Sequence, residues 1–203
     1  MTPAYLASLC AAIYSPVPGW FDSIFDNGSV CVGIQLRDGK TILAFRGSKT
    51  GLDWLHDFEA VPVHVAGLGT VHGGFYDGTV DAFRSLDLHE GASVIITGHS
   101  LGCSHAAIIA HMCLNAGVKV EQLYLFAPPR CGYSDFLNGL DFIPDVKAWC
   151  NGLDPVPHVP IWLPDFPWMQ FPLIHIFERP EGLDEFIPTD WHSIELYLKS
   201  VQS

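Results

Sequence analysis

The chain has 203 residues, and its composition, 49% hydrophobic and only 16% charged, excludes intrinsic disorder and predicts a single domain over residues 1–203. Its formal net charge is −12, because 22 aspartates and glutamates outnumber 10 lysines and arginines. An acidic chain repels phosphate backbones and anionic membrane surfaces, so nucleic acid is not expected as a partner and a neutral small-molecule substrate is favoured.

The first residues do not resemble a targeting signal. Residues 1–10 lack a basic region, and apolar character stops at Ser15-Pro16, which is unlike a secretory signal. No apolar stretch approaches the roughly 18 residues of a membrane-spanning helix. We therefore expect a soluble protein, with the cytoplasm favoured and a mature secreted form left open. The six cysteines form no C-x-x-C pair, so buried free thiols are expected rather than a disulfide framework.

The first predicted elements are two strands joined by a tight turn. Residues 30–36 and 41–45 are apolar runs rich in β-branched side chains, and Arg37-Asp38-Gly39-Lys40 lies between them. An Asp-Gly pair between two such runs predicts a β-hairpin.

The middle of the chain alternates apolar runs with helical patterns. Strands are predicted at 93–97, 123–127 and 146–150, and helices at 74–87, 101–116 and 191–201. This alternation predicts an α/β fold: a mostly parallel central sheet with helices on both faces and the hairpin at its early edge. Segment 155–188 differs, because its eight prolines exclude a long helix or a central strand. We expect an irregular apolar loop over the top of the sheet there.

A G-x-S-x-G motif, Gly98-His99-Ser100-Leu101-Gly102, connects the predicted strand 93–97 to the helix that follows. This strand–turn–helix context is typical of a nucleophile elbow, in which glycines avoid collisions with the neighbouring strand and helix. The serine hydroxyl then stands above a helix N-terminus, whose partial positive charge favours an oxyanion. Ser100 is thus the predicted nucleophile; the alternative is a glycine-rich turn with a capping serine.

A serine nucleophile needs a general base downstream in a fold of this type. His192 is the favoured base, because it lies just before the last predicted helix and can reach back to the elbow. His105 and His111 belong to the helix after the elbow and point away from the reaction. His175 lies in an apolar run and is expected to be a core histidine. His158 lies only four residues after Asp154, the predicted acid, which is too close for the two to be partners.

The acid that orients the base is predicted to be Asp154. It stands in a turn directly after the strand that ends at Cys150, which places it at the same sheet edge as Ser100. A turn-forming aspartate is the alternative, and Asp190 is expected to be a helix cap.

Several blocks in the right order resemble the class 3 (fungal-type) lipases of the compact α/β-hydrolase fold. Beside the elbow, these blocks are Ala44–Ser48 with Asp53–Asp57, Val71–Phe75, Phe126–Arg130 and Asp154–His158. Two residues depart from the usual pattern: Ala127 stands where a glycine is usual, and Cys103 where glycine or alanine is usual.

The resemblance implies a hydrolase of carboxylic esters, most simply of acylglycerols, that needs no cofactor. Ser100, Asp154 and His192 would form the triad, and the backbone N–H groups of Ser48 and Leu101 would form the oxyanion hole. Residues 49–60 would be a lid. The open alternatives are a phospholipase A1, a small-ester esterase, an acyltransferase and a non-catalytic module that binds lipid or protein.

The remaining histidines and aromatic residues allow two interpretations. His56, His64 and His72 recur at regular spacing, but no metal-binding motif includes them, so no metal is expected. The segment with Trp162, Phe166, Trp168, Met169 and Phe171 predicts either an acyl-chain wall with transient lipid contact or core packing under a long loop. No protein partner is predicted.

Overall fold

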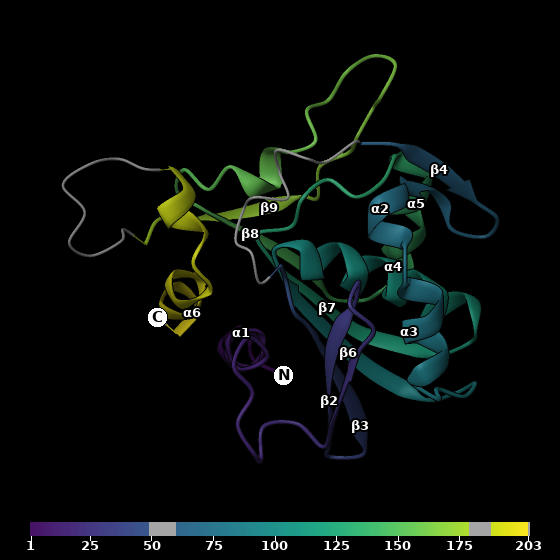
Figure 1. Cartoon of the computed structure of the whole chain (residues 1–203), viewed down its shortest axis with the longest axis vertical. Helices are drawn as coiled ribbons and strands as arrows, with labels where there is room; N and C mark the ends of the chain where they lie inside the picture. The colour runs from purple at the N-terminus through teal and green to yellow at the C-terminus, as the bar shows by residue number, and fades with distance from the viewer. Residues whose placement is uncertain (49–59, 179–187, 203) are drawn as a thin grey trace.

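The computed structural model describes residues 1–48, 60–178 and 188–202, and its centre is a seven-stranded sheet (Figure 1). The strand order is β1-β2-β3-β6-β7-β8-β9, antiparallel from β1 to β3 and parallel from β3 to β9. The strands are β1 (Ser23–Asp26), β2 (Cys31–Arg37), β3 (Lys40–Phe45), β6 (Ser93–His99), β7 (Lys119–Phe126), β8 (Val146–Asn151) and β9 (Leu173–Ile176). The predicted α/β fold with an early hairpin is confirmed.

The β2–β3 hairpin closes through two residues with positive φ, Asp38 at 53° and Gly39 at 73°. Both central residues of a type I′ turn need positive φ, which is why Asp-Gly signals this turn in the sequence. The turn pairs Arg37 with Lys40 and thereby sets the register of the whole hairpin.

Helices cover both faces of the sheet, and each face has its own core. The helix α4 (Leu101–Asn115) packs on one face with α2 (Gly73–Tyr76), α3 (Thr79–Ser85) and α5 (Ser134–Asn138), whereas α1 (Pro3–Ala12) and α6 (Ile194–Gln202) pack on the other (Figure 1). Strand β3 supplies both cores alternately: Leu43 and Phe45 belong to the α4 side, and Ile42 and Ala44 to the α1–α6 side. This alternation is the period of two that a doubly covered strand requires.

Smaller elements complete the described chain. The strands β4 (Pro62–Val65) and β5 (Gly69–His72) form a separate hairpin, and short 3₁₀ helices lie at η2 (Gly139–Phe142), η3 (Val156–His158) and η4 (Pro188–His192). All six cysteines are buried free thiols, as expected from the sequence. None of the described helices has the length and apolar character needed to cross a membrane.

Two predictions about local structure were wrong. The helix expected over 74–87 is two helices, because Gly78 adopts a φ of 73° and interrupts it between α2 and α3. The proline-rich segment is not wholly irregular, since β9 adds an edge strand to the sheet. As the last strand, β9 is covered poorly, so His175 is exposed and is not a core histidine.

Candidate active site

The nucleophile elbow joins β6 to α4. Ser100 adopts φ 58° and ψ −132°, a strained conformation for a residue with a side chain, and its N–H donates to the carbonyl of Phe126 at 2.9 Å. The residue is only 3% exposed. Backbone strain at this position is typical of a serine held at the tip of a sharp turn.

The two glycines of the motif let helix and strands approach closely. A Cβ on Gly98 would lie 2.5 Å from the carbonyl oxygen of Gly102, and a Cβ on Gly102 would lie 2.3 Å from the carbonyl oxygen of Phe45. Both contacts are with backbone atoms, so no side chain could rotate away. Cys103 fits the same tight space, and its thiol donates to the carbonyls of Gly98 and Phe126, each at 3.1 Å.

Ser100, His192 and Asp154 meet in one chain of hydrogen bonds. The Oγ of Ser100 lies 2.8 Å from Nε2 of His192, and Nδ1 of His192 lies 2.9 Å from Oδ2 of Asp154. Because the carboxylate only accepts, Nδ1 of His192 donates to it, and Nε2 is left to accept the serine proton. The predicted convergence of these three residues, separated by up to 92 positions, is what the structure contains.

The carboxylate of Asp154 is fully buried and accepts two further hydrogen bonds. The N–H of Val156 donates to Oδ1 at 2.9 Å, and the hydroxyl of Tyr197 donates to Oδ2 at 2.6 Å. The same tyrosine hydroxyl accepts the N–H of Asn151 at 2.9 Å. Burial raises the pKa of Tyr197, which keeps its hydroxyl protonated as a donor. Three donors, from residues 156, 192 and 197, therefore hold this carboxylate in place without contact with solvent.

A second histidine, His99, holds the backbone of His192. Nε2 of His99 donates to the backbone carbonyl of His192 at 3.0 Å, and Nδ1 of His99 accepts the hydroxyl of Tyr14 at 2.8 Å. Burial, followed by the neighbouring His192, holds the pKa of His99 well below its ordinary value, so this ring stays neutral. The Tyr14–His99 pair fixes the backbone that carries His192.

Sequence reasoning missed three of these residues. Tyr197 lies on α6 and Tyr14 follows α1, and no spacing connects either with the motif. His99 stands inside the motif itself, so its place beside the nucleophile was available from the sequence, although its contact with residue 192 was not.

The two predicted oxyanion donors, Ser48 and Leu101, are next in sequence to residues that touch or precede the elbow helix: Gly47 lies against Ser100, and Leu101 follows Ser100 directly. Leu101 is the first residue of α4, where N–H groups have no acceptor inside the helix. On the other side, a Cβ on Gly47 would come within 2.9 Å of Cβ of Ser100, so the segment that leads to Ser48 lies against Ser100. Ser48 itself is half-buried. The predicted lid over 49–60 lies outside the described residues, except for Ala60.

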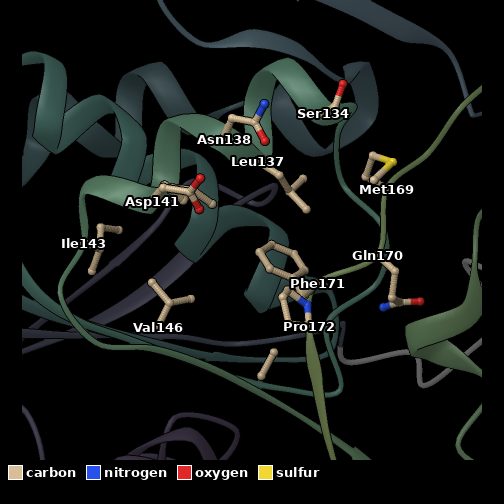
Figure 2. Close-up of a pocket in the computed structure, with 12 residues that line it drawn as sticks. Ser134, Leu137, Asn138, Asp141, Ile143, Val146, Met169, Gln170, Phe171 and Pro172 are labelled. Atoms are coloured by element: carbon tan, nitrogen blue, oxygen red, sulfur yellow. The ribbon is translucent and has the colours of Figure 1, made fainter.

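A cavity of about 430 Å³ lies away from the triad, between α5, η2, the start of β8 and residues 169–172 (Figure 2). Leu137, Val146, Met169 and Phe171 are among its apolar walls, and no triad residue lines it. The aromatic side chains predicted in this segment differ in burial: Trp168 and Phe171 are buried, whereas Trp162 and Phe166 are exposed. No three His, Cys, Asp or Glu side chains among residues 1–48, 60–178 and 188–202 are grouped to hold a metal ion.

Comparison with known proteins identifies the family. Two rice proteins called phospholipase A1-II 1, from Oryza sativa subsp. indica and subsp. japonica, are 24% identical to this chain over 84% of its length. The chain spans about half the length of these curated relatives, 53%.

Solved lipase structures share the fold. A triacylglyceride lipase from Rhizomucor miehei superimposes with a TM-score of 0.67 at 23% identity, covering 87% of this chain and 78% of that one. A lipase from Rhizopus microsporus var. chinensis gives a TM-score of 0.71 at 20% identity, covering 90% and 75%. The model of the lipase (class 3) family matches residues 42–163, from β3 to beyond Asp154. With more than half of its length matched by that model and an α/β-hydrolase sheet in common with fungal lipases, the chain belongs to the class 3 lipase family.

Proposed function

We propose that the protein is a serine hydrolase of lipid esters, with Ser100 as nucleophile, His192 as general base and Asp154 as the acid that orients the base. The observation that carries this proposal is the hydrogen-bonded chain from Oγ of Ser100 through the imidazole of His192 to the buried carboxylate of Asp154. Each donor and acceptor in that chain points in the direction that proton transfer needs.

The reaction follows from these positions. Ser100 attacks the ester carbonyl while Nε2 of His192 takes its proton, and the N–H groups of Ser48 and Leu101 hold the tetrahedral oxyanion. The alcohol leaves with the proton from His192, and an acyl group stays on Ser100. Water then attacks this acyl-enzyme by the same steps in reverse and releases the carboxylic acid. Loss of one oxyanion donor costs about 10²–10³-fold in rate in such sites.

The lipid character of the substrate rests on the family and on the surface. A water-insoluble ester is held in droplets, micelles or bilayers, so the enzyme must contact a lipid surface. The exposed side chains of Ile161, Trp162, Leu163 and Phe166, in the segment that follows the acid, support such contact.

Replacement of Ser100 by alanine tests the mechanism. We expect Ser100→Ala to lower hydrolysis of p-nitrophenyl butyrate by roughly 10⁴-fold or more, since the covalent step needs the hydroxyl. Ser104→Ala, one turn further along α4 and outside the triad, is the matched control and should keep its activity. Unchanged turnover by Ser100→Ala, in a protein that folds normally, would discard the mechanism.

A phospholipase A1 activity is the second candidate, because the curated relatives carry that name. It differs from the first only in the head group that the site accepts. Hydrolysis of a triacylglycerol and of a phosphatidylcholine labelled on its sn-1 chain should be compared at equal interfacial area. Faster release of the sn-1 chain would make the protein a phospholipase, and activity on soluble acetate esters alone would make it a small-ester esterase.

A further inference from the structure

A short loop, residues 161–166, carries a contiguous group of exposed apolar side chains, and we call it the apolar prong. All six of its residues are exposed. Four of them are large and apolar, with exposed fractions of 71% for Ile161, 51% for Trp162, 50% for Leu163 and 42% for Phe166. Single exposed apolar side chains are ordinary, but a contiguous group of this kind marks a contact surface.

The tip of the prong is a closed turn. The N–H of Leu163 donates to the carbonyl of Phe166 at 3.1 Å, and the N–H of Phe166 donates back at 3.0 Å. Pro164 and Asp165 form the two-residue connection between them. Because both bonds lie within the loop, the apolar side chains are displayed on a preformed backbone, and binding costs little ordering entropy.

The base of the prong is fastened to the body of the protein by Arg130. Its backbone N–H donates to the carbonyl of Val159 at 2.8 Å, its Nη1 donates to the carbonyl of Pro160 at 3.2 Å, and its Nε donates to Oε1 of Gln170 at 3.2 Å. Arg130 thereby binds the chain on both sides of the prong, at residues 159–160 before it and at residue 170 after it.

Trp168 anchors the returning limb. It is 1% exposed and packs between His72 and Tyr133, with ring centroids 5.2 Å and 5.0 Å away. The prong therefore stands on a buried aromatic base and projects from the molecule as the green loop at the top of Figure 1. It begins three residues after η3, which follows directly from the turn of Asp154.

The charge of this region identifies the kind of surface that it fits. Residues 151–178 contain no lysine or arginine, and Asp165 is the one ionisable residue of the prong. With a net charge of −12 on the chain, contact with an anionic lipid surface is unfavourable. A protein partner would need about 800 Å² of matched surface on each side, which four side chains cannot supply. Tryptophan with aliphatic neighbours is instead the composition that settles at the boundary of a neutral bilayer or droplet.

We propose that the apolar prong inserts into an uncharged or zwitterionic lipid surface and holds the edge of the sheet that carries Asp154 against it. This inference rests on the proposed function for its purpose, since a lipid ester must be reached at such a surface. Its physical basis, the exposed and braced apolar loop, is independent of Ser100.

Vesicle flotation with the inactive Ser100→Ala protein tests the proposal without interference from hydrolysis. We expect it to float with phosphatidylcholine vesicles and to float at least 10-fold less with vesicles rich in phosphatidylglycerol. A further Trp162→Ser/Leu163→Ser change should reduce flotation on phosphatidylcholine at least 10-fold. The matched control is Ile24→Ser/Leu36→Ser, which removes two exposed apolar residues of the β1–β2 region and should float as the parent does.

Three results would overturn the proposal. The first is equal flotation of the prong variant and its parent, and the second is equal loss in the control. The third is light scattering that shows the prong joining two copies of the chain in place of lipid binding. None of these three results bears on the mechanism at Ser100. Conversely, full hydrolysis by Ser100→Ala together with prong-dependent flotation would refute the proposed function and leave this inference standing.

Discussion

The hydroxyl of Tyr197 is the clearest example of a supporting residue in the site. It donates to Oδ2 of Asp154 at 2.6 Å and accepts the N–H of Asn151 at 2.9 Å, and the side chain is fully buried. Tyr197→Phe leaves one buried N–H and one carboxylate lone pair without their partner. We expect the free energy of unfolding to fall by about 1–3 kcal/mol, the usual cost of stranding buried polar groups.

Activity should fall with it, because Asp154 would hold the imidazole less firmly. Urea denaturation and the kcat of p-nitrophenyl butyrate hydrolysis measure both effects in one protein. Tyr5→Phe is a suitable control, since its hydroxyl donates to Gln35, far from the triad along the chain. A Tyr197→Phe protein with unchanged stability and kcat would show that this hydrogen bond supports neither.

At this scale the sequence predicted the residues that belong to local motifs. Ser100 follows from the elbow, and Asp154 from its place at the end of a buried strand. Tyr14 and Tyr197 could not be predicted, because their contacts span 85 and 43 positions and depend on how α1 and α6 pack beside the sheet. At Ala127 the structure explains a departure that the sequence only revealed. The residue adopts a φ of 60°, a conformation that glycine adopts without strain, which is why glycine is usual there.

Among the elements, α4 lies close against β3, and Gly102 makes this approach possible. A methyl group there would meet the carbonyl oxygen of Phe45 at 2.3 Å, so helix and strand would have to separate. We expect Gly102→Ala to cost about 3 kcal/mol or more, and to lower activity because Ser100 moves with the helix. Denaturation midpoints measure the first effect and ester hydrolysis the second.

Gly91 provides the comparison for that experiment. It has a φ of 81°, and a methyl group added there would meet no other atom within 4 Å, so Gly91→Ala carries only the backbone strain. That strain amounts to about 1–2 kcal/mol. If Gly102→Ala proves as mild as Gly91→Ala, the close contact between α4 and β3 does not constrain the elbow.

Strands buried on both faces and the helix after the elbow were predictable because their patterns are strong. The predicted strand 93–97 lies within β6, and the predicted helix 101–116 ends one residue beyond α4. Weakly patterned elements were not predicted. The helix α1 is apolar on all sides and shows no helical periodicity, β1, β4 and β5 have only four residues each, and β9 is a four-residue strand among prolines. Residues 173–176 form a strand by pairing with β8, and their own sequence shows no pattern that predicts it.

For the molecule as a whole, buried neutral histidines link stability to pH. Burial lowers the pKa of His72 and of His105 to about 4, and holds the pKa of His99 well below its ordinary value. Above a pH of about 6.5 these rings are neutral in both the folded and the unfolded chain. Below it the unfolded chain binds protons that the folded chain does not, so stability is lost as the pH falls from about 6.5 towards 4.

Each of these histidines should contribute roughly 1 kcal/mol of stability loss per pH unit in that window. Urea denaturation at pH 7.5, 6.0 and 5.0 measures the slope, and His105→Gln should reduce the proton uptake on unfolding by about one. His89→Gln, at an exposed position, is the control for the loss of a histidine outside the core. A stability that is constant between pH 7.5 and 5.0 would contradict the burial of these rings as neutral groups.

Covalent labelling with a fluorophosphonate, followed by mass spectrometry, tests most directly whether Ser100 is an activated nucleophile. We expect one adduct per chain, on the peptide that contains Ser100, and about 10³-fold slower labelling of His192→Ala, because Nε2 of His192 takes the serine proton. No adduct at Ser100, or equal labelling of the His192→Ala protein, would contradict the proposed role of this serine.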